Sequence, residues 1–525
     1  MENTHINMKN IHLIHYFERT AQQRAERIAV HDGERSIYFC QLRSASIRLA
    51  YAIHNHLHRQ TRKIVAIFLP KSIELIIGNL SALYSGNAYM NLDVKNPAAR
   101  IQSIIDNISP ALILTTQEWV KKLEGLVPPE NILLIDELIS SESDLPEPSA
   151  EQLQTIEKCH KSNIDTDPAC VINTSGSTGI PKGVILNHRS FLDITERVLE
   201  LGLVQEDEIA GSLVPPIFDA YSFELCMLMA KGSTLVLIPE KFSAFPVRIL
   251  ELLERHRVTF IFWVPTIMVN IANMDLLANF PLPNLRTVWF IGEVFPTPKY
   301  NYWAKKLPHA RFANFYGPIE ITLACTYFLV DRDIPDHEPI PIGHPFPNTE
   351  ILVLDENDQP VQGEEEGELC VRGSSLAMGY YNNPQKTAAA FVQNPLNPHY
   401  PELIYRTGDI VAYNARGELV YKGRRDTIIK HLGYRIELGE IEQAAINLQD
   451  SIRNCCAIYN KANKHIVLIY EAHDDSVEEA RIRAGLLKAL PKYMMPAKLI
   501  RIDLMPRNAN GKIDRLALRE QYSTL

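Results

Sequence analysis

The sequence Thr174-Ser-Gly-Ser-Thr-Gly-Ile-Pro-Lys-Gly183 directly follows an apolar run at residues 169–173. Its small residues allow backbone N–H groups and serine and threonine hydroxyls to close around phosphate oxygens, and Lys182 adds a positive charge. The spacing does not meet the G-x-x-x-x-G-K-(S/T) pattern of P-loop ATPases. The stretch therefore predicts a buried strand followed by a triphosphate-binding loop of a different kind. A flexible Ser/Gly surface turn is the alternative.

Further β-rich runs alternate with helix-like stretches on both sides of this loop. They occupy residues 65–69, 111–115, 131–135, 234–238, 258–263 and 287–291. This alternation is typical of α/β layers with largely parallel sheets. Residues 137–168 are acidic and rich in Ser and Pro, and we expect an irregular surface connection there.

The last third of the chain has a different pattern of predicted secondary structure. From residue 351 on, short strands separated by turn signals predict a smaller β-rich lobe. After Arg425, helical and strand patterns at residues 439–447 and 465–472 predict one more small domain. We therefore expect a linker near residues 424–427.

The composition is that of a globular chain with several packed cores. Its 525 residues are 46% hydrophobic and 22% charged, which excludes a disordered, collagen-like or coiled-coil protein. Lys and Arg number 53 against 62 for Asp and Glu, so the net charge of -9 offers no basic field for nucleic acid or an anionic membrane. The uncharged residues 258–274 include a proline and two asparagines, and they predict a buried strand and helix rather than a membrane span.

The cysteines and the N-terminal residues indicate the cellular compartment of the protein. The eight cysteines form no C-x-x-C pair, as expected of reduced thiols, and the first residues lack the pattern of a signal peptide. We therefore expect a cytoplasmic protein.

A series of motifs runs through nearly the whole chain. It comprises YSGNAYMNLD at residues 84–93, the phosphate loop, FD at 218–219, NFYGPIE at 314–320, GEL at 367–369, YRTGD at 405–409, GRRD at 423–426, GYRIELGE at 433–440, LPKYMMP at 490–496 and NGKIDR at 510–515. In content and order this series resembles the adenylate-forming superfamily of acyl-CoA synthetases, luciferases and nonribosomal peptide synthetase adenylation domains. Within that superfamily the chain resembles a freestanding amino acid adenylation enzyme and its D-alanine–carrier ligase relatives.

The resemblance implies an α/β fold in two domains. Residues 1–425 would form a large N-terminal domain with two α/β subdomains and the smaller β-rich lobe, and residues 426–525 a small, mobile α+β domain. Asp426 matches the family hinge. Rotation about it would bring Lys512 into the site for adenylation, and the loop with Gly433 and Arg435 into the site for thioester formation.

The resemblance also implies an ATP site. Lys512 matches the catalytic lysine that bridges the substrate carboxylate and the α-phosphate, and Glu320 matches the ligand of Mg²⁺. Tyr316 matches the aromatic residue that stacks on adenine, and Asp409 the carboxylate that accepts the ribose hydroxyls. The other implied nucleotide and phosphate contacts are Thr174, Ser175, Gly176, Ser177, Thr178, Gly179, Lys182, Gly292, Glu293, Asn314, Phe315, Gly317, Tyr421 and Arg424. ATP and Mg²⁺ are thus the expected cofactors.

Asp219 stands where amino-acid-activating members present a carboxylate to the substrate α-ammonium. A buried charge is costly unless it is paired, so this residue favours a cationic amine; capping of the following helix is the alternative role. Motif alignment gives the remaining pocket residues as Ala220, Phe223, Phe262, Trp289, Ile291, Phe315, Leu323 and Ala324, with Lys512 on the substrate carboxylate. Most are large and none is charged, which favours alanine, glycine, serine or proline.

The expected reaction forms an aminoacyl-AMP with release of pyrophosphate and then loads the phosphopantetheine thiol of a separate carrier protein. We expect a monomer or dimer that binds neither nucleic acid nor membrane. Two enzymatic alternatives are coenzyme A as the acceptor and a D-alanine–carrier ligase, although Ile291 stands where such ligases have cysteine. Ile319 replaces the usual threonine near the α-phosphate, which leaves a weakly active adenylate-binding scaffold as the non-enzymatic alternative.

Overall fold

The computed structural model describes residues 12–136, 138–139, 147–175, 181–202, 204–424, 428–448, 452–461, 463–472, 478–506 and 513–522. Several predicted site residues lie outside these ranges. They are Gly176, Ser177, Thr178 and Gly179 of the phosphate loop, the predicted hinge residue Asp426 and the predicted catalytic residue Lys512.

A seven-stranded sheet contains the strand that precedes the phosphate loop. Its order is β18-β8-β7-β4-β3-β5-β6. The strands are β3 (Ile64–Ile67), β4 (Ala88–Asn91), β5 (Leu112–Thr115), β6 (Ile132–Leu134), β7 (Pro168–Thr174), β8 (Lys182–Asn187) and β18 (Gly379–Tyr380). Strands β7, β4, β3, β5 and β6 run parallel, whereas β8 and β18 add antiparallel pairs.

A nine-stranded sheet forms the second large layer, in the order β15-β14-β13-β12-β11-β9-β10-β1-β2. The strands are β1 (Ile28–Asp32), β2 (Arg35–Tyr38), β9 (Ile209–Ser212), β10 (Thr234–Leu237), β11 (Phe260–Trp263), β12 (Thr287–Ile291), β13 (Arg311–Tyr316), β14 (Thr326–Leu329) and β15 (His344–Pro345). Its central strands are parallel, and its two edges are antiparallel.

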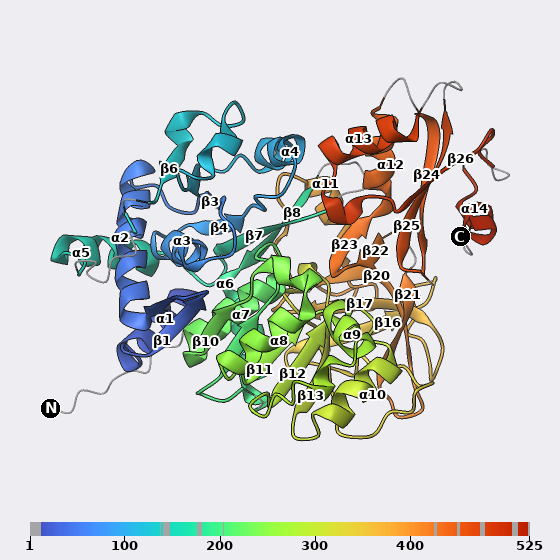
Figure 1. Cartoon of the computed structure of the whole chain (residues 1–525), viewed down its shortest axis with the longest axis horizontal. Coiled ribbons are helices and arrows are strands. Elements are labelled where there is room, and N and C mark those ends of the chain that lie inside the picture. The colour runs from blue at the N-terminus through green and yellow to red at the C-terminus, as the bar shows by residue number, and fades with distance from the viewer. Residues whose placement is uncertain are drawn as a thin grey trace.

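Helices pack against both sheets (Figure 1). They are α1 (Leu13–Gln23), α2 (Phe39–His56), α3 (Ile73–Tyr84), α4 (Ala98–Ile108), α5 (Ala150–Lys161), α6 (His188–Glu200), α7 (Asp219–Lys231), α8 (Pro246–Arg255), α9 (Pro265–Asn273), α10 (Thr297–Lys306) and α11 (Pro384–Ala390). Helix α7 is buried from Ala220 to Met229, as expected of a helix that is apolar on all sides.

Side-chain alternation along the central strands explains how the nine-stranded sheet buries both of its faces. Phe260 and Phe262 of β11 join the main core, which also includes α7 and residues of the seven-stranded sheet. The intervening Ile261 and Trp263 join a second core with α8, α9 and α10. Because successive side chains of a strand point to opposite faces, the same sheet supports both cores.

A separate antiparallel sheet follows in the chain. It contains β16 (Thr349–Leu354), β17 (Gly367–Gly373), β19 (Phe391–Gln393), β20 (Leu403–Tyr413) and β21 (Leu419–Arg424). This sheet is the predicted β-rich lobe.

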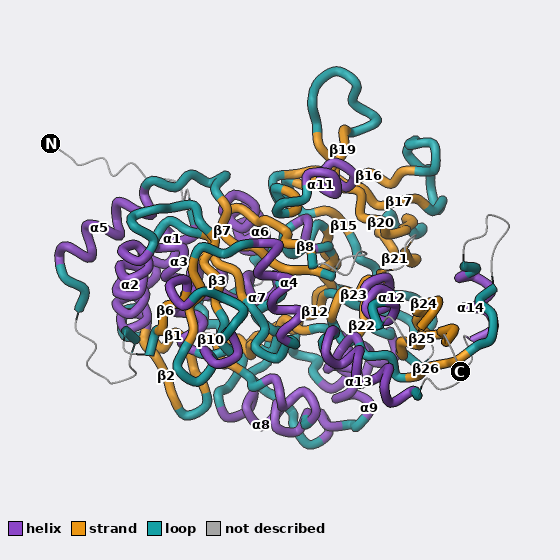
Figure 2. Tube along the Cα trace, turned by 90° about the horizontal axis from the view of Figure 1, so that it is seen from above, coloured by secondary structure: helices purple, strands orange, loops and turns teal. Residues whose placement is uncertain are grey.

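The last part of the chain has its own sheets and cores and lies at the end of the molecule opposite α2 and α5 (Figures 1 and 2). Its elements are β22 (Ile428–His431), β23 (Tyr434–Glu437), α12 (Leu438–Ile446), β24 (Ile452–Asn460), β25 (His465–Ala472), α13 (Glu479–Ala489), β26 (Lys498–Arg501) and α14 (Arg515–Tyr522). Cys455 and Cys456 point to the two different cores of this part. The expected boundary at residues 425 and 426 stays a prediction, because residues 425–427 lie outside the described ranges.

The predicted strands are present within one or two residues of their expected ends, and the uncharged residues 258–274 form β11 and α9. The expectation of an irregular connection at residues 137–168 was wrong, because α5 lies within it. Ser149 and Gln152 form a capping box at the start of this helix, a local signal that the acidic composition concealed. The eight cysteines, all of which lie in the described ranges, form no disulfide. Among the described residues, no helix has both the length and the apolar character that a membrane crossing requires.

Candidate active site

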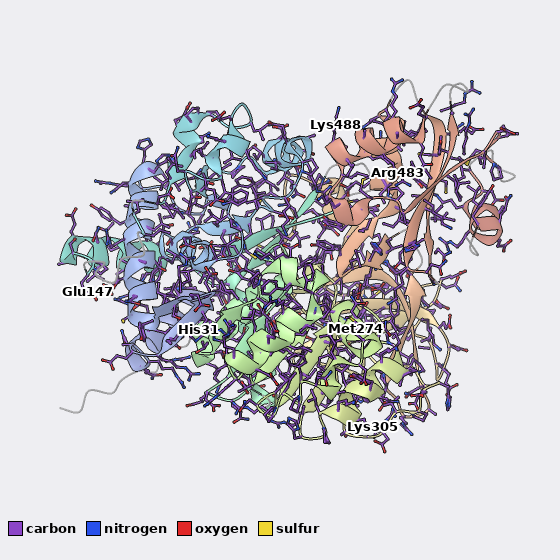
Figure 3. All side chains as sticks on the ribbon, viewed as in Figure 1. His31, Glu147, Met274, Lys305, Arg483 and Lys488 are labelled. Carbon is purple, nitrogen blue, oxygen red and sulfur yellow. The ribbon has the colours of Figure 1, made fainter. Side chains whose placement is uncertain are left out.

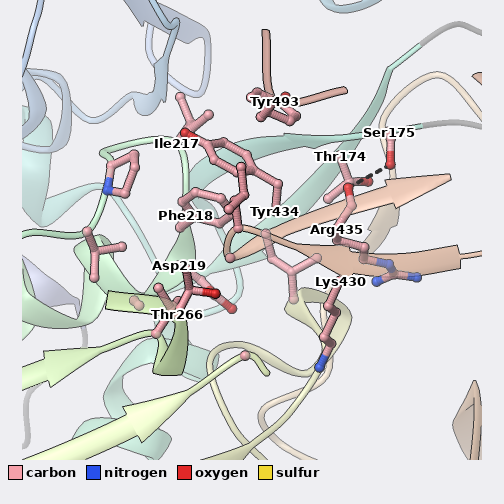
Figure 4. Close-up of a pocket in the computed structure, with 18 of the residues that line it drawn as sticks. Thr174, Ser175, Ile217, Phe218, Asp219, Thr266, Lys430, Tyr434, Arg435 and Tyr493 are labelled. Carbon is pink, nitrogen blue, oxygen red and sulfur yellow. Dashed lines mark hydrogen bonds between the residues drawn. The ribbon is translucent and has the colours of Figure 1, made fainter. Parts of the chain in front are cut away.

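A cavity of about 960 Å³ lies where the carboxyl ends of parallel strands meet the C-terminal part of the chain. It is lined by residues at or just beyond the ends of β7, β9, β11 and β12, such as Thr174, Leu213, Val264 and Gly292. Residues of the β22–β23 hairpin complete it, and Figure 4 shows part of this lining. Ligands of α/β proteins commonly bind at such strand ends. The cavity is large enough for a nucleotide.

Asp219 is the first residue of α7 and lines the cavity. Its Oδ2 accepts a hydrogen bond of 3.0 Å from the backbone N–H of Leu323, in a loop far along the chain. Burial raises the pKa of this carboxyl to about 6. Since Phe218 occupies the cap position of the helix, Asp219 is not its N-cap residue, and a cationic group in the cavity would favour its charged form.

The predicted pocket residues separate into two groups. Asp219, Ala220 and Ile291 line the cavity, whereas the other predicted pocket residues within the described ranges are buried among the elements that support it. Phe223, Phe262, Trp289 and Phe315 form one aromatic cluster, with ring centroids 5.8 Å apart for Phe223 and Phe262, 5.9 Å for Phe262 and Trp289, and 4.7 Å for Trp289 and Phe315. Leu323 and Ala324 are fully buried. Phe223 lies one turn along α7 from Asp219, so the aromatic cluster packs beside the helix that carries this carboxylate.

Glu320 is completely buried in a short 3₁₀ turn, Ile319–Ile321. The Tyr380 hydroxyl donates to its Oε1 at 2.8 Å, and Nη1 of Arg435 donates to its Oε2 at 2.6 Å. Burial acts to raise the pKa of Glu320, but Arg435 and the hydrogen bonds outweigh it and hold the pKa below its usual value. The carboxylate has the oxygen chemistry that Mg²⁺ prefers, yet both of its oxygens are engaged here.

Asp409 and Tyr316 lie together at the predicted adenosine end of the site. Asp409 accepts hydrogen bonds from the Tyr316 hydroxyl and, at 2.6 Å, from Nη1 of Arg424, its register partner on the adjacent strand. The Tyr421 ring lies 6.3 Å from the Tyr316 ring. On the face of Tyr316, Nζ of Lys430 lies 5.4 Å from the ring centroid, and burial lowers the pKa of this lysine.

The described ends of the phosphate loop contact the C-terminal part of the chain. Ser175 Oγ donates to the Arg435 carbonyl at 2.8 Å, as Figure 4 shows, and accepts from Glu437 N–H at 2.9 Å. Lys182 Nζ lies 3.6 Å from a Glu437 carboxylate oxygen and 5.5 Å from the Tyr380 ring centroid. A positive group is therefore present beside the loop.

The remaining predicted nucleotide contacts lie around the same cavity. Glu293 Oε1 accepts from Gly433 N–H at 2.7 Å, and its other oxygen accepts from the Thr266 backbone at 3.0 Å. Asn314 is held by a hydrogen bond of 2.8 Å to the Pro341 carbonyl. A Cβ on Gly317 would lie 2.5 Å from the Ala324 Cα, so this close approach requires glycine.

The predicted loop of the second half-reaction faces the cavity. Gly433 and Arg435 contact Glu293 and Glu320, and Tyr434 stacks on Tyr493 with ring centroids 3.6 Å apart. A buried ion pair between Arg100 of α4 and Glu440 of α12 adds to this interface.

Several side chains at the site were not among the sequence predictions, and three of them contact or adjoin predicted residues. Asn173, Tyr380 and Lys430 lie at or beside the cavity. Both side-chain polar atoms of Asn173 are buried and have no partner among the described residues. Asn173 directly precedes the phosphate loop, which was the available signal; nothing local marked Tyr380, which reaches Glu320 only through the fold.

Comparisons with known proteins agree with this geometry. The family model described as AMP-binding enzyme matches residues 17–381, well over half of the chain. The chain is 32% identical over 518 residues to tyrocidine synthase 2 and 31% identical over 522 residues to tyrocidine synthase 1, both of Brevibacillus parabrevis. The matches cover 96% and 98% of this chain but only 13% and 45% of those relatives, so the chain spans less than half the length of each.

Solved structures confirm the expected α/β fold, with a large N-terminal domain and a small C-terminal part. The Vibrio cholerae adenylation domain AlmE, solved with glycyl-adenosine-5'-phosphate, has a TM-score of 0.83 at 20% identity, with 100% of each chain covered. Holo-PA1221, a nonribosomal peptide synthetase protein with adenylation and carrier domains, has a TM-score of 0.79 at 24% identity over 97% of this chain and 84% of that one. Since the family model matches well over half of the chain, including β7, β9, β11 and β12 at the cavity, the chain belongs to the AMP-binding enzyme family of ATP-dependent, AMP-forming ligases, as its motifs predicted.

Proposed function

We propose that the protein activates a small, uncharged α-amino acid with ATP and transfers it to the phosphopantetheine thiol of a carrier protein. In the first step a carboxylate oxygen of the amino acid attacks the α-phosphorus, the bond to the β-phosphate oxygen breaks, and pyrophosphate leaves. In the second step the thiol sulfur attacks the carbonyl carbon, AMP leaves, and the thiol proton passes to solvent. The observation that carries the proposal is the Asp219 carboxylate on the wall of the cavity.

An amino acid is the substrate class that best explains Asp219. A carboxylate whose pKa is raised by burial gains most from a cationic partner, and the α-ammonium group of an amino acid is such a partner. An acid without an amine would leave this carboxylate unpaired in the cavity. This argument favours amino acids over fatty or aryl acids.

The aromatic cluster of Phe223, Phe262, Trp289 and Phe315 supports a small side chain. These rings are buried and in mutual contact, so a large substrate side chain would have to displace them. AlmE, which shares the fold, was solved with a glycyl-adenylate. We propose glycine, alanine, serine or proline as the substrate. A difference of one methyl is worth only about 1 kcal/mol, too little to choose among them.

The proposed ATP site uses residues on both sides of the cavity. Asp409 would accept the ribose hydroxyls, with Tyr316 beneath the base and Arg424 beside it, and Ser175 and Lys182 would contact phosphate oxygens. Glu320 would hold Mg²⁺, which supplies positive charge to the triphosphate. Lys512 is proposed to bridge the two reacting anions and so reduce their repulsion.

The ion pair between Glu320 and Arg435 supports two arrangements of the domains, one for each half-reaction. With Arg435 on Glu320, the carboxylate is satisfied by protein. We therefore propose that the described arrangement serves the thioester step. Rotation about Asp426 would withdraw Arg435 and Gly433, free Glu320 for the metal ion and bring Lys512 to the cavity for adenylation.

Amino-acid-dependent ATP–pyrophosphate exchange tests the first step. The panel is the proteinogenic amino acids, D-alanine, and several aryl and fatty acids. We expect exchange with one or a few small amino acids and a loss of about two to three orders of magnitude in the Lys512→Ala variant. Lys488→Ala is the matched control, because Lys488 is an exposed lysine on the same part of the chain (Figure 3).

The pattern of exchange separates the alternatives. Exchange with D-alanine alone would favour the D-alanine–carrier ligase. Exchange only with acids that lack an amine would overturn the role of Asp219, and no exchange with any acid would favour the scaffold. Transfer of the labelled aminoacyl group to purified carrier proteins, compared with coenzyme A, then identifies the acceptor.

A further inference from the structure

We propose that His12, His15 and His160 form a binding site for a divalent transition metal ion, with Zn²⁺ as the preferred ion. The three side chains lie at the junction of α1 and α5, on elements that do not line the cavity of the active site. One ring nitrogen from each lies within 4.8 Å of the others. Among the described residues, this is the one group of three or more His, Cys, Asp or Glu residues whose potential ligand atoms all lie this close together.

The sequence and the fold each supply part of the cluster. His12 is the N-cap residue of α1, and His15 lies three residues further on in the first turn of this helix. Their ring centroids are 3.8 Å apart. His160 comes from the last turn of α5, and its ring lies 5.2 Å from that of His12 and 6.3 Å from that of His15, nearly perpendicular to both.

These separations are close to those of imidazoles that share one ion. With Zn–N bonds of about 2 Å and tetrahedral angles, the ring centroids of two ligands lie about 5 Å apart. The His12–His160 separation is already at that value, and the other two lie on either side of it. Small side-chain rotations would therefore bring the three nitrogens to one ion.

Two of the ring nitrogens are buried without a hydrogen bond. His12 is 2% exposed and His160 is 7% exposed, and neither Nε2 of His12 nor Nδ1 of His160 has a partner among the described residues. A buried polar atom without a partner is unfavourable, and each such atom in a folded protein requires an explanation. A metal ion bound by these two nitrogens would satisfy both of them.

The protonation state suits a metal ligand. Burial, together with the neighbouring histidines, lowers the pKa of His12 to about 2, and burial lowers that of His160 to about 4. Both imidazoles are therefore neutral at physiological pH, and neutral imidazole is the form that binds Zn²⁺. Burial also lowers the pKa of His15.

Neighbouring groups define the limits of the site. His188 lies 5.8 Å from His12, but its Nδ1 accepts the Leu13 N–H at 3.3 Å, so its other nitrogen carries the proton and cannot bind a metal. The Glu18 carboxylate is held by Arg43 and Tyr84. Three imidazole nitrogens match the ligand preference of Zn²⁺ and disfavour Mg²⁺, which prefers oxygen ligands.

An ion at this place would stabilise the packing that supports the substrate site. Helix α1 packs against α6 and α7 through hydrogen bonds from Tyr16 to Glu196 and from Thr20 to the Met229 carbonyl. Helix α7 begins at Asp219. The ion would fasten α1 to α5 and so hold the outer side of this helical layer. Its role would be structural, because no cavity residue is among its ligands.

The test uses the full chain after treatment with a chelator. Zn²⁺ is titrated by calorimetry at about pH 7.5, where the histidines are neutral, and Co²⁺ by visible absorption. We expect one equivalent of Zn²⁺ to bind, and this binding to require the histidine cluster. Bound Co²⁺ should give an intense visible absorption band, which is typical of low-symmetry coordination. The midpoint of thermal unfolding should rise with Zn²⁺ concentration. The variants are His15→Gln, at a half-buried position, and His160→Gln. His309→Gln, at an exposed position outside the cluster, is the control.

The outcomes are distinct. Zn²⁺ affinity lower by about tenfold or more in both cluster variants, with the control unchanged, supports the site. Absence of binding, or binding that persists in both variants, overturns it and assigns the rings a purely packing role. Circular dichroism establishes that the variants are folded. These readouts involve neither ATP nor an amino acid, so they stand apart from the test of the proposed function.

Discussion

A single carboxylate, Asp219, links the fold to the proposed substrate. It begins α7, lines the cavity and is held by the Leu323 N–H from a distant loop. The sequence identified this residue through its place in the motif series. Its environment follows from burial, which raises its pKa to about 6.

The raised pKa of Asp219 predicts the pH dependence of amino acid binding. Below about pH 6 the carboxyl holds a proton in the free protein, and a neutral carboxyl cannot pair with an ammonium group. We expect kcat/KM for the amino acid in ATP–pyrophosphate exchange to fall about tenfold for each pH unit below this value and to level off above it. The measurement is the exchange rate at limiting amino acid and saturating ATP.

Asp219→Asn should lower kcat/KM at neutral pH and remove this dependence, because asparagine does not titrate. A wild-type profile that stays flat through pH 6 would contradict the pairing of Asp219 with the substrate amine.

Trp289 should act on both stability and specificity. It is fully buried in the aromatic cluster beside Asp219, so Trp289→Ala should lower the free energy of unfolding by about 3–5 kcal/mol. The space it leaves should raise exchange with larger amino acids relative to glycine and alanine. Urea unfolding and the exchange panel measure the two effects.

Trp303→Ala is the matched control for this prediction. Trp303 is equally buried but belongs to the core on the other face of the nine-stranded sheet. It should lose comparable stability with no change of specificity. An unchanged substrate preference in Trp289→Ala would show that the cluster does not limit the size of the substrate.

At the scale of elements, the β22–β23 hairpin brings the C-terminal part of the chain into contact with the candidate active site. Its residues reach three different parts of the N-terminal domain, because Gly433 contacts Glu293, Arg435 contacts Glu320, and Ser175 lies between the Arg435 carbonyl and Glu437 N–H. Lys430 of β22 extends over Tyr316. A two-stranded element thus joins the predicted metal, phosphate and adenine sites.

Arg435→Ala should separate the two half-reactions. The side chain contacts Glu320 in the described arrangement, which we assign to the thioester step. We expect transfer to the carrier to slow by about two orders of magnitude, while pyrophosphate exchange stays within about threefold of the wild type. Single-turnover transfer of a preformed aminoacyl-adenylate is the measurement. Equal losses in both reactions would refute the assignment.

At the scale of the whole molecule, the ion pair between Arg100 and Glu440 is one of the buried contacts that connect the N-terminal domain with the small C-terminal part. Arg100 lies on α4 and Glu440 on α12, and both side chains are almost fully buried. Removal of one partner from a buried pair typically costs about 3–5 kcal/mol, because the other charge stays desolvated. The pair therefore stabilises this relative position of the domains and no other.

Glu440→Gln should shift the domains away from the described arrangement. We expect slower thioester formation, unimpaired pyrophosphate exchange and a larger radius of gyration by small-angle X-ray scattering. Glu442→Gln is the control, because Glu442 pairs with Arg515 inside the C-terminal part and should not affect the balance between arrangements. A scattering profile identical to that of the wild type, with normal transfer, would argue against a role for this pair.

Local patterns in the sequence determined the layers of the molecule. Apolar runs such as residues 169–173 and 287–291 became β7 and β12, because continuous apolar runs bounded by turns are typical of strands buried on both faces. Helix α5 was missed because it lies in an acidic stretch rich in Ser and Pro, although the capping box at Ser149 marks its start. The order of the motifs also identified the family.

Only the tertiary structure decided which of the predicted residues share a cavity. It left Phe223, Phe262, Trp289 and Phe315 in the core and gave Glu320 the partners Tyr380 and Arg435, which are 60 and 115 residues away along the chain. It also brought His160 to His12 and His15. The physical reason is that periodicity and capping act over a few residues, whereas contacts between distant segments depend on how whole layers pack.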